Sequence, residues 1–337
     1  MLTLFKPYGS VDMEKKLYGD LVRVVGVTEP EGPLRDAEIQ RKIQDCHILQ
    51  ADVDINVNKD FLKDAKELRA VLCTSIGVDY VNLEEMTEMG IPVANSPDFC
   101  IEAVAEYAIG LMFAVTRQIP RAALGVASGN WAVRRLTGGI ELQGKTLGII
   151  GFGRIGREVA RMARALGLHV IVYQSHVKSE VAKQFGVETV SLMQICREAD
   201  IVSIHAPLTE ETYGLLDESA FAEMKEGVYL VNVSRGGIIV EKDLVKAIEK
   251  GKVGGVALDV LEQEPPDENH PLLGMIDKNV IITPHTAWNT FEAEQKADYH
   301  FKVQLEAVCA GEMPPSLLNE SVRKHPRVAK WQGCQQK

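Results

Sequence analysis

A glycine-rich turn near the middle of the chain constrains the fold more than any other stretch. The apolar residues 147–150 predict a buried strand, and residues 157–166 have the apolar spacing of a helix that ends at Gly167. Three glycines at the spacing G-x-G-x-x-G lie between them: Gly151, Gly153 and Gly156. This order predicts a tight turn that places a helix N-terminus against the phosphates of a dinucleotide. A glycine turn without a ligand is the alternative, which the flanking strand and helix disfavour.

Composition and length are those of an ordinary globular protein. The 337 residues are enough for two domains, and 46% are apolar and 25% charged. The 37 basic and 47 acidic side chains give a net charge of −10 without a long basic run, so nucleic acid is not an expected partner. No signal-peptide pattern opens the chain, and no apolar run is long enough to cross a bilayer. We therefore expect a cytoplasmic protein that does not bind membranes.

The cysteines indicate a reducing compartment. They are scattered along the chain, no two form a C-x-x-C pair, and no His/Cys cluster has the spacing of metal ligands. We therefore expect free thiols and no metal site. The six residues are Cys46, Cys73, Cys100, Cys196, Cys309 and Cys334.

The first 96 residues predict a smaller α/β unit. Expected strands cover residues 21–27, 47–49, 70–74 and 90–95, and expected helices cover 36–46 and 59–68. Alternating strands and helices predict a parallel sheet. Residues 75–79 directly follow a strand, so we expect them at the carboxyl end of the sheet, where ligands of such sheets bind. Gly77 in this stretch is equally consistent with a simple turn.

Two features lie between this unit and the glycine turn. Residues 103–116 are apolar on nearly every face but too few to span a membrane comfortably, which favours a buried helix. Residues 118–143 are mixed in character, and Trp131 lies there near Arg134 and Arg135. An aromatic side chain in such an arm fits a subunit contact and packing within the chain equally well.

Strands and helices continue to alternate after the glycine turn. Expected strands cover residues 169–173, 201–205, 228–233, 255–260 and 280–283, and expected helices cover 192–199 and 242–250. This pattern is typical of a doubly wound parallel sheet with helices on both faces. An amphipathic helix is expected at 291–310, and residues from 324 onward have no clear pattern and are expected to be mobile.

Polar or titratable side chains follow the later strands. They are Arg235, Asp259, Glu264 and His285. The strand ends of a doubly wound sheet face the crevice that holds a dinucleotide. Each residue alone fits a structural role, such as an ion pair or a solvated acid. Together with the glycine turn, they form a site able to oxidise an alcohol.

Hydride transfer assigns a role to each of these side chains. The hydroxyl proton needs a base with a pKa near neutrality, which histidine provides through His285. Glu264 is the candidate carboxylate that raises the pKa of His285 and fixes its tautomer. Arg235 is expected to hold the substrate carboxylate and polarise its carbonyl with a planar fork of donors. Asp259 is expected to accept a hydrogen bond from the nicotinamide amide.

Four stretches of the chain resemble the D-isomer-specific 2-hydroxyacid dehydrogenase family. They are residues 144–156, 232–237, 257–266 and 283–287, and the resemblance extends over nearly the whole chain. It implies two Rossmann-like domains, each a doubly wound parallel sheet, with a cleft between them. Residues 1–99 and 291–337 would form a discontinuous substrate-binding domain, and residues 100–290 would bind the dinucleotide. It also implies an NAD(P)-dependent oxidoreductase acting on a small D-2-hydroxy acid or 2-keto acid, and members are usually homodimers.

The resemblance also assigns site residues. It implies Arg235, Glu264 and His285 as the catalytic set, with Glu264 rather than Glu262 at the family's acid position. Backbone amides near Ile76 and Gly77 would hold the substrate carboxylate. The residues expected to contact the cofactor are Gly151, Phe152, Gly153, Arg154, Ile155, Gly156, Val104, Gln174, Pro207, Val233 and Asp259.

Two positions depart from the family's pattern. Gln174 stands where members that use NAD usually carry an acid, and His176 and Lys178 follow it. Loss of the carboxylate removes repulsion of a 2′-phosphate, yet Gln174 is still able to hydrogen-bond a ribose, so NAD and NADP both stay open. Trp288 is large where we expect a small residue, and it either caps the substrate pocket or packs between the domains.

Two rival functions stay open on the sequence alone. A cofactor-sensing scaffold, like the family's transcriptional corepressor relatives, would keep the glycine turn and need no turnover. A formate- or phosphite-oxidising enzyme would use the same arginine for its small anion. Oxidation of NADH or NADPH by a panel of 2-keto acids would separate these functions. No residue indicates which 2-hydroxy acid is used, because side-chain selection depends on the shape of loops.

Overall fold

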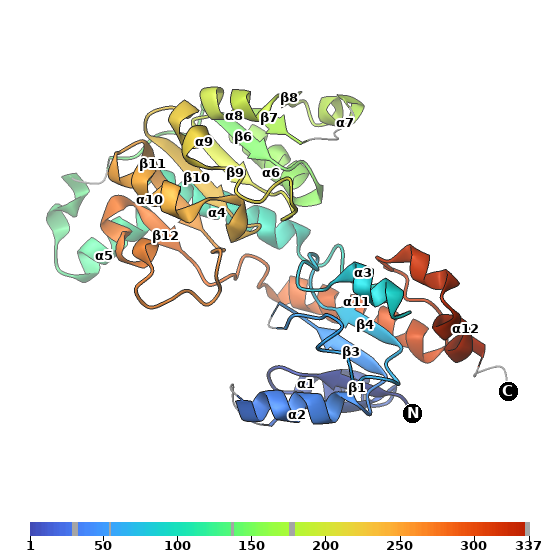
Figure 1. Ribbon diagram of the computed structural model, residues 1–337. Helices are drawn as coiled ribbons and strands as arrows, with labels where there is room; N and C mark the ends of the chain where they lie inside the picture. Colours follow the sequence, from blue (N-terminus) through green and yellow to red (C-terminus); the bar gives the residue numbers. More distant parts are fainter. Residues whose placement is uncertain (29–32, 54, 136–137, 175–178, 334–337) are drawn as a thin grey trace. The chain divides into compact units, whose positions relative to one another are not determined.

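The chain folds into two compact units. The computed structural model describes residues 1–28, 33–53, 55–135, 138–174 and 179–333. Met1–Phe99 and Phe291–Lys337 form the first unit, and Cys100–Thr290 form the second. Each unit contains one parallel sheet with helices, which confirms the predicted α/β class (Figure 1). Among the described residues, no helix combines the length and apolar character needed to cross a bilayer.

The first unit contains a five-stranded sheet with the order β2-β1-β3-β4-β5. All of its neighbouring strands pair in parallel. Its elements are β1 (Thr3–Lys6), α1 (Asp12–Tyr18), β2 (Arg23–Gly26), α2 (Pro33–Ile43), β3 (Ile48–Ala51), β4 (Ala70–Cys73), α3 (Leu83–Glu88), β5 (Val93–Ala94), α11 (Phe291–Cys309), η5 (Glu320–Lys324) and α12 (Pro326–Gly333).

Alternate residues of these strands bury two separate cores. Phe5, Leu49 and Val71 pack with α2 and α3 on one face of the sheet. Leu4 and Ile48 point to the other face, where they pack with Phe301, Leu305 and Val308 of α11. The amphipathic helix expected at 291–310 therefore completes the core of the N-terminal strands, although nearly 200 residues separate them.

The predicted helix at 59–68 is wrong, because these residues form successive turns. The amide of Leu62 donates to the carbonyl of Asn58 at 3.1 Å, and that of Ala65 donates to Leu62 at 3.0 Å. Leu62, Ala65 and Leu68 are all buried. Apolar residues at every third position therefore suit a run of turns as well as they suit a helix.

The expectation of a mobile tail from residue 324 is also wrong over the described residues. Residues 326–333 form α12, which starts at a proline, as helices often do. Val328 is fully buried. The Arg327 guanidinium donates to the carbonyls of Lys66 at 2.9 Å and Leu68 at 2.6 Å, so the tail fastens the turns at 59–68.

The second unit contains a seven-stranded parallel sheet with the order β12-β11-β10-β9-β6-β7-β8. Its elements are α4 (Ile101–Thr116), α5 (Ile119–Ala127), η1 (Trp131–Arg135), β6 (Thr146–Ile150), α6 (Arg154–Ala165), β7 (His169–Tyr173), α7 (Ser179–Gln184), β8 (Glu188–Thr189), α8 (Leu192–Glu198), β9 (Ile201–Ile204), α9 (Glu218–Glu223), β10 (Val228–Asn232), η2 (Gly236–Ile238), α10 (Glu241–Glu249), β11 (Val253–Leu258), η3 (Pro271–Gly274), η4 (Ile276–Lys278) and β12 (Val280–Ile282).

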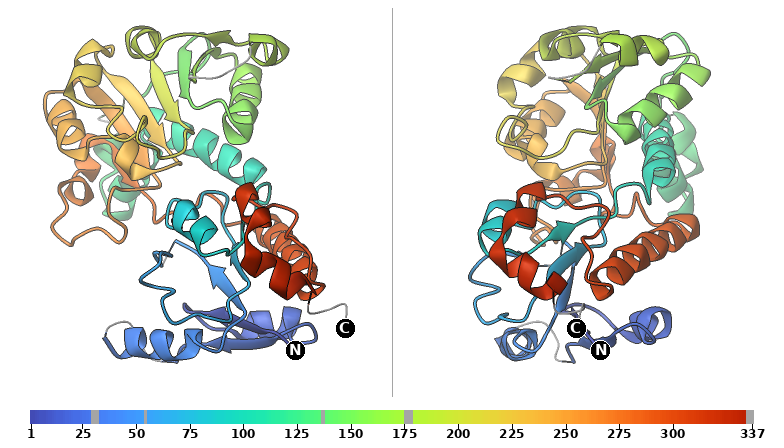
Figure 2. Two further views of the ribbon diagram at one scale, coloured as in Figure 1. Left: turned by 45° about the vertical axis from the view of Figure 1, so that its right-hand side comes forward. Right: turned by 90° about the vertical axis from the view of Figure 1, so that its right-hand side faces the viewer.

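Helices cover both faces of this sheet (Figures 1 and 2). α8, α9 and α10 pack on one face, where their apolar side chains share a core with Ile150, Ile204 and Leu230. α4 and α6 pack together on the other face. β9 pairs with β6 on the side opposite β7, so the strand order reverses between β6 and β9. This reversal is the switch point at which doubly wound sheets bind nucleotides.

The arm between α4 and the glycine turn is apolar and exposed. α4 is the buried helix expected at 103–116. α5 buries none of its residues, and Leu124 is 55% exposed. Trp131 follows it in η1 and is 69% exposed, which rules out burial within this chain as the role of its ring.

Candidate active site

Arg235 lies in a turn that follows β10. Asn232 is fully buried, and its side chain donates to the Arg235 carbonyl at 2.9 Å and accepts from the Ser234 amide at 3.0 Å. A Cβ atom on Gly236 would lie 1.9 Å from the carbonyl carbon of Leu261. Only glycine therefore lets this turn approach the loop that carries Glu264.

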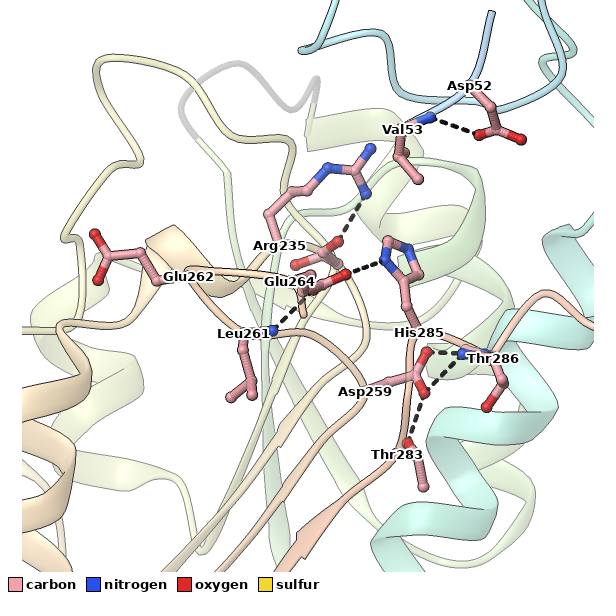
Figure 3. A network of polar contacts seen from close by, with 12 residues as sticks. Asp52, Val53, Arg235, Asp259, Leu261, Glu262, Glu264, Thr283, His285 and Thr286 are labelled. Carbon is pink, nitrogen blue, oxygen red and sulfur yellow. Dashed lines mark hydrogen bonds and ion pairs between the residues drawn. The ribbon is translucent and has the colours of Figure 1, made fainter. Parts of the chain in front are cut away.

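Glu264 and His285 form a hydrogen-bonded pair (Figure 3). Glu264 Oε2 lies 2.7 Å from His285 Nδ1, and Glu264 Oε1 accepts from the Leu261 amide at 2.9 Å. Because an ionised carboxylate only accepts hydrogen bonds, Nδ1 of the imidazole carries the proton. Nε2 is therefore the nitrogen left to exchange a proton with a ligand.

The pair shifts both pKa values. The hydrogen bond to Glu264 raises the pKa of His285 above its ordinary value, while burial and the charge of Arg235 act in the opposite direction. Burial acts to raise the pKa of Glu264, but the hydrogen bond and charge of His285, together with the Leu261 amide and the charge of Arg235, lower it overall. The pair therefore favours a protonated imidazole beside a carboxylate.

Asp259 fixes the backbone on which His285 stands. His285 has a φ of 54°, which is uncommon for a non-glycine residue, and its amide donates to the Asp259 carbonyl at 2.8 Å. The buried Asp259 carboxylate accepts from the Thr283 hydroxyl at 2.6 Å and from the Thr286 and Ala287 amides at 3.0 and 2.8 Å. It thus clamps the segment on both sides of His285, a role that sequence reasoning missed. Its contact with a nicotinamide amide stays a prediction.

A second set of side chains, also missed, supports the loop that carries Glu264. Glu241 Oε1 accepts from the Glu262 amide at 2.8 Å, and Glu241 Oε2 lies 2.8 Å from His270 Nε2. The Tyr213 hydroxyl donates to the Glu262 carboxylate at 2.8 Å. Glu262 thus has a different partner from Glu264, and Figure 3 shows its side chain pointing away from Glu264 and His285. No local signal could reveal these bonds, because their partners lie 21 to 49 positions apart in the chain.

The glycine turn has the geometry that a dinucleotide requires. Gly151 has a φ of 93°, and a Cβ atom there would lie 2.4 Å from the Ala206 nitrogen. A Cβ atom on Gly156 would lie 2.2 Å from the Gly151 oxygen, whereas one on Gly153 would meet no atom within 4 Å. The first and third glycines therefore allow close packing, and the second leaves open space before the N-terminus of α6. This arrangement fits a pyrophosphate.

The other predicted cofactor contacts lie in the glycine turn and the start of α6, near strand ends or, for Val104, in α4. Phe152, Val104 and Val233 are buried, whereas Pro207 is exposed after β9, the strand beside β6. Arg154 is exposed, and Ile155 is half-buried, in the first turn of α6. Gln174 Oε1 accepts from the Phe152 amide at 2.6 Å. His176 and Lys178 lie outside the described residues.

Ile76 and Gly77 belong to the first unit and lie in the loop shortly after the end of β4. The Asn95 side chain donates to the Ile76 carbonyl at 2.7 Å, and the Ser75 hydroxyl donates to the Gly77 carbonyl at 2.7 Å. Within the described residues, neither amide has a backbone or side-chain acceptor. Two half-buried amides with their carbonyls held in place are suited to an anion.

Trp288 lies three residues after His285 and is 37% exposed. A ring of this size leaves a large part of its apolar surface in water. Neither of its two predicted roles is decided by its position, and both stay predictions.

The chain is similar to known dehydrogenases and reductases. Residues 109–287 match the model of the D-isomer specific 2-hydroxyacid dehydrogenase, NAD binding domain. D-3-phosphoglycerate dehydrogenase of Methanocaldococcus jannaschii is 39% identical over 90% of this chain and 58% of its own length, so the chain spans little more than half of that relative. Glyoxylate reductase of Korarchaeum cryptofilum is 36% identical over 87% of this chain and 89% of its own. The crystal structure of D-lactate dehydrogenase from Aquifex aeolicus, complexed with NAD and lactic acid, is 26% identical with a TM-score of 0.84, over 94% of this chain and 99% of that one.

Proposed function

Because the chain belongs to the D-isomer specific 2-hydroxyacid dehydrogenase family, we propose that it transfers hydride between NAD(P)(H) and a small D-2-hydroxy acid or 2-keto acid. The pairing of His285 with Glu264 at 2.7 Å carries this proposal, because it supplies a tuned proton donor and acceptor. The glycine turn and the strand ends that bear the pair belong to one sheet. The glycine turn and α6 would hold the pyrophosphate of a dinucleotide, which when bound would supply or accept the hydride.

His285 moves the proton in this account. In the reducing direction, Nε2 of the imidazolium donates a proton to the carbonyl oxygen of the keto acid as that carbon becomes reduced. Glu264 stabilises the imidazolium before transfer and keeps the proton of Nδ1 in place, so the proton leaves from Nε2. In the oxidising direction, Nε2 of the neutral ring takes the hydroxyl proton.

Arg235 and the amides of Ile76 and Gly77 would hold the substrate. The guanidinium presents paired donors that match a carboxylate and an adjacent carbonyl oxygen. Two amide groups in the first unit, without acceptors among the described residues, are suited to donate to a carboxylate. These contacts would hold the carboxylate and the adjacent carbonyl that all 2-keto acids share. The choice of substrate side chain is left to the surrounding loops.

A panel assay tests the proposed function. The full chain is mixed with NADH or NADPH and with glyoxylate, hydroxypyruvate or pyruvate, and nicotinamide absorbance is followed. We expect oxidation of the cofactor with at least one of these acids and a D product from a prochiral one. Binding of the cofactor without oxidation by any acid would favour a sensing scaffold instead.

We also propose a homodimer formed through α5 and η1, and a cytoplasmic location. Ile119, Leu124 and Trp131 are about half exposed or more, and α5 buries no residue in its own chain. A nine-residue helix that buries none of its residues has little stability of its own, so a second copy of the chain is the partner that we infer. The five described cysteines are free thiols, which suits a reducing compartment.

A further inference from the structure

The end of β7 is tied to the glycine turn by two successive residues. The Gly151 amide donates to the carbonyl of Tyr173 at 2.9 Å. The Phe152 amide donates to the side chain of Gln174 at 2.6 Å. Gln174 therefore stands beside the turn in a fixed position, at the place where an adenosine ribose reaches the end of the second strand of a dinucleotide site.

The bond to Phe152 decides which way the Gln174 amide points. A backbone N–H only donates, so the side-chain atom that faces it must be the carbonyl oxygen. The –NH2 group of the half-buried side chain consequently faces away from Phe152, and no atom of the described residues accepts a hydrogen bond from it. Gln174 thus offers two N–H donors to a ligand, while one of the two lone pairs of its oxygen is engaged by Phe152.

These donors suit one form of the cofactor better than the other. The free 2′- and 3′-hydroxyls of NAD donate to the carboxylate that usually stands here, and Gln174 replaces it with an uncharged oxygen that already accepts one hydrogen bond, from Phe152. A 2′-phosphate has only acceptor oxygens and a charge close to −2 at neutral pH. The phosphate therefore accepts hydrogen bonds from N–H donors, and the uncharged Gln174 side chain does not repel it.

We propose that Gln174 selects NADP(H) over NAD(H) by donating from its amide nitrogen to the 2′-phosphate. This inference rests on the proposed function for the presence of a dinucleotide site. It adds the phosphorylated cofactor as the preferred ligand and names the side chain that prefers it. In the simpler alternative, Gln174 only fastens the glycine turn and does not distinguish the two cofactors.

Direct binding of the two cofactors tests the proposal without turnover. The full chain is titrated with NADPH and with NADH in the absence of a keto acid, and binding is followed by nicotinamide fluorescence and calorimetry. We expect the wild-type Kd for NADPH to be at least about tenfold lower than that for NADH, since charge-assisted hydrogen bonds form only with the phosphate.

The variant Gln174→Glu keeps the shape and the acceptor for Phe152 but replaces the donors with a charge. We expect its Kd for NADPH to rise about 30-fold by repulsion of the phosphate, while its Kd for NADH stays level or falls. Gln295→Glu makes the same change of charge at an exposed position of α11 and should leave both Kd values unchanged.

The outcomes separate this inference from the proposed function. Tighter wild-type binding of NADH, or equal effects of Gln174→Glu on both cofactors, would overturn the role of Gln174 and leave the dehydrogenase function intact. Binding of neither cofactor by the wild-type chain would overturn both. The ratio of the wild-type Kd values for NADH and NADPH still tests the proposed preference if the Gln174→Glu variant fails to fold.

Discussion

The acid at position 264, rather than the one two residues earlier, should set the proton chemistry of His285. Both carboxylates lie on one loop, but Glu264 bonds to the imidazole, whereas Glu262 bonds to the hydroxyl of Tyr213. Reduction of a keto acid needs protonated His285, so its rate is full below the pKa of His285 and falls as pH rises through it. The pKa of His285 is raised chiefly by the hydrogen bond to Glu264, so loss of that carboxylate should move the fall to lower pH.

We therefore predict that Glu264→Gln shifts the basic limb of kcat/KM for keto-acid reduction to lower pH and reduces the rate. Glu262→Gln is the matched control, because it removes the same charge from the same loop, and its profile should keep the wild-type limb. Profiles recorded between pH 5 and 10 would decide. A limb that is unmoved in Glu264→Gln, or that moves equally in both variants, would contradict the assignment.

At the same scale, the sequence indicates the reacting side chains and not the ones that hold them. Arg235, Glu264 and His285 stand in short motifs after predicted strands, so their local signal is strong. Asp259 was interpreted as a ligand contact because its type and place allow one. Its three bonds to residues 283–287 depend on how two adjacent strands end, which no local pattern records.

At the scale of elements, the start of α10 supports the loop between β11 and η3. Glu241 in its first turn binds the backbone of that loop at Glu262 and the ring of His270. We predict that Glu241→Ala lowers kcat/KM about tenfold and moves the basic limb to lower pH, because a loosened loop weakens the contact of Glu264 with His285. Kinetics at several pH values provide the measurement.

Two further variants make that prediction specific. Glu241→Gln keeps an acceptor for the Glu262 amide and should restore most of the activity. Glu249→Ala changes an exposed acid at the other end of α10 and should have no effect. A tenfold loss in Glu241→Ala without any shift of the limb would point to a general structural role instead.

Elements with a strong period were predictable, and those held by distant contacts were not. The strand at 169–173 and the helix start at 291 match the structure because continuous apolar runs and amphipathic spacing fix them locally. The apolar spacing of residues 59–68 fits a run of turns as well as it fits a helix. α12 is held by hydrogen bonds from Arg327 to carbonyls more than 250 positions away in the chain. β1 (Thr3–Lys6) was not predicted, although this four-residue strand pairs with both β2 and β3.

At the scale of the whole molecule, the exposed face of α5 and η1 predicts the oligomeric state. We expect light scattering to give twice the mass of one 37.1 kDa chain. Leu124→Glu combined with Trp131→Glu should produce a monomer, because buried charges without partners oppose association. Tyr299→Glu changes an exposed ring on α11 and should leave the dimer intact. A monomeric wild-type chain, or a double variant that remains dimeric, would contradict this interface.

The account depends above all on His285 passing a proton while the cofactor passes a hydride to the same substrate. The most direct measurement follows deuterium from a reduced nicotinamide that carries deuterium at both C4 positions into the product of hydroxypyruvate or pyruvate. It is made for the wild-type chain and for His285→Asn, which tolerates a positive φ. We predict one deuterium at C2 of a D-2-hydroxy acid. We also predict a rate at least about 100-fold lower in the variant, with cofactor binding unchanged. Product without the label, or a variant that turns over at the wild-type rate, would contradict the account.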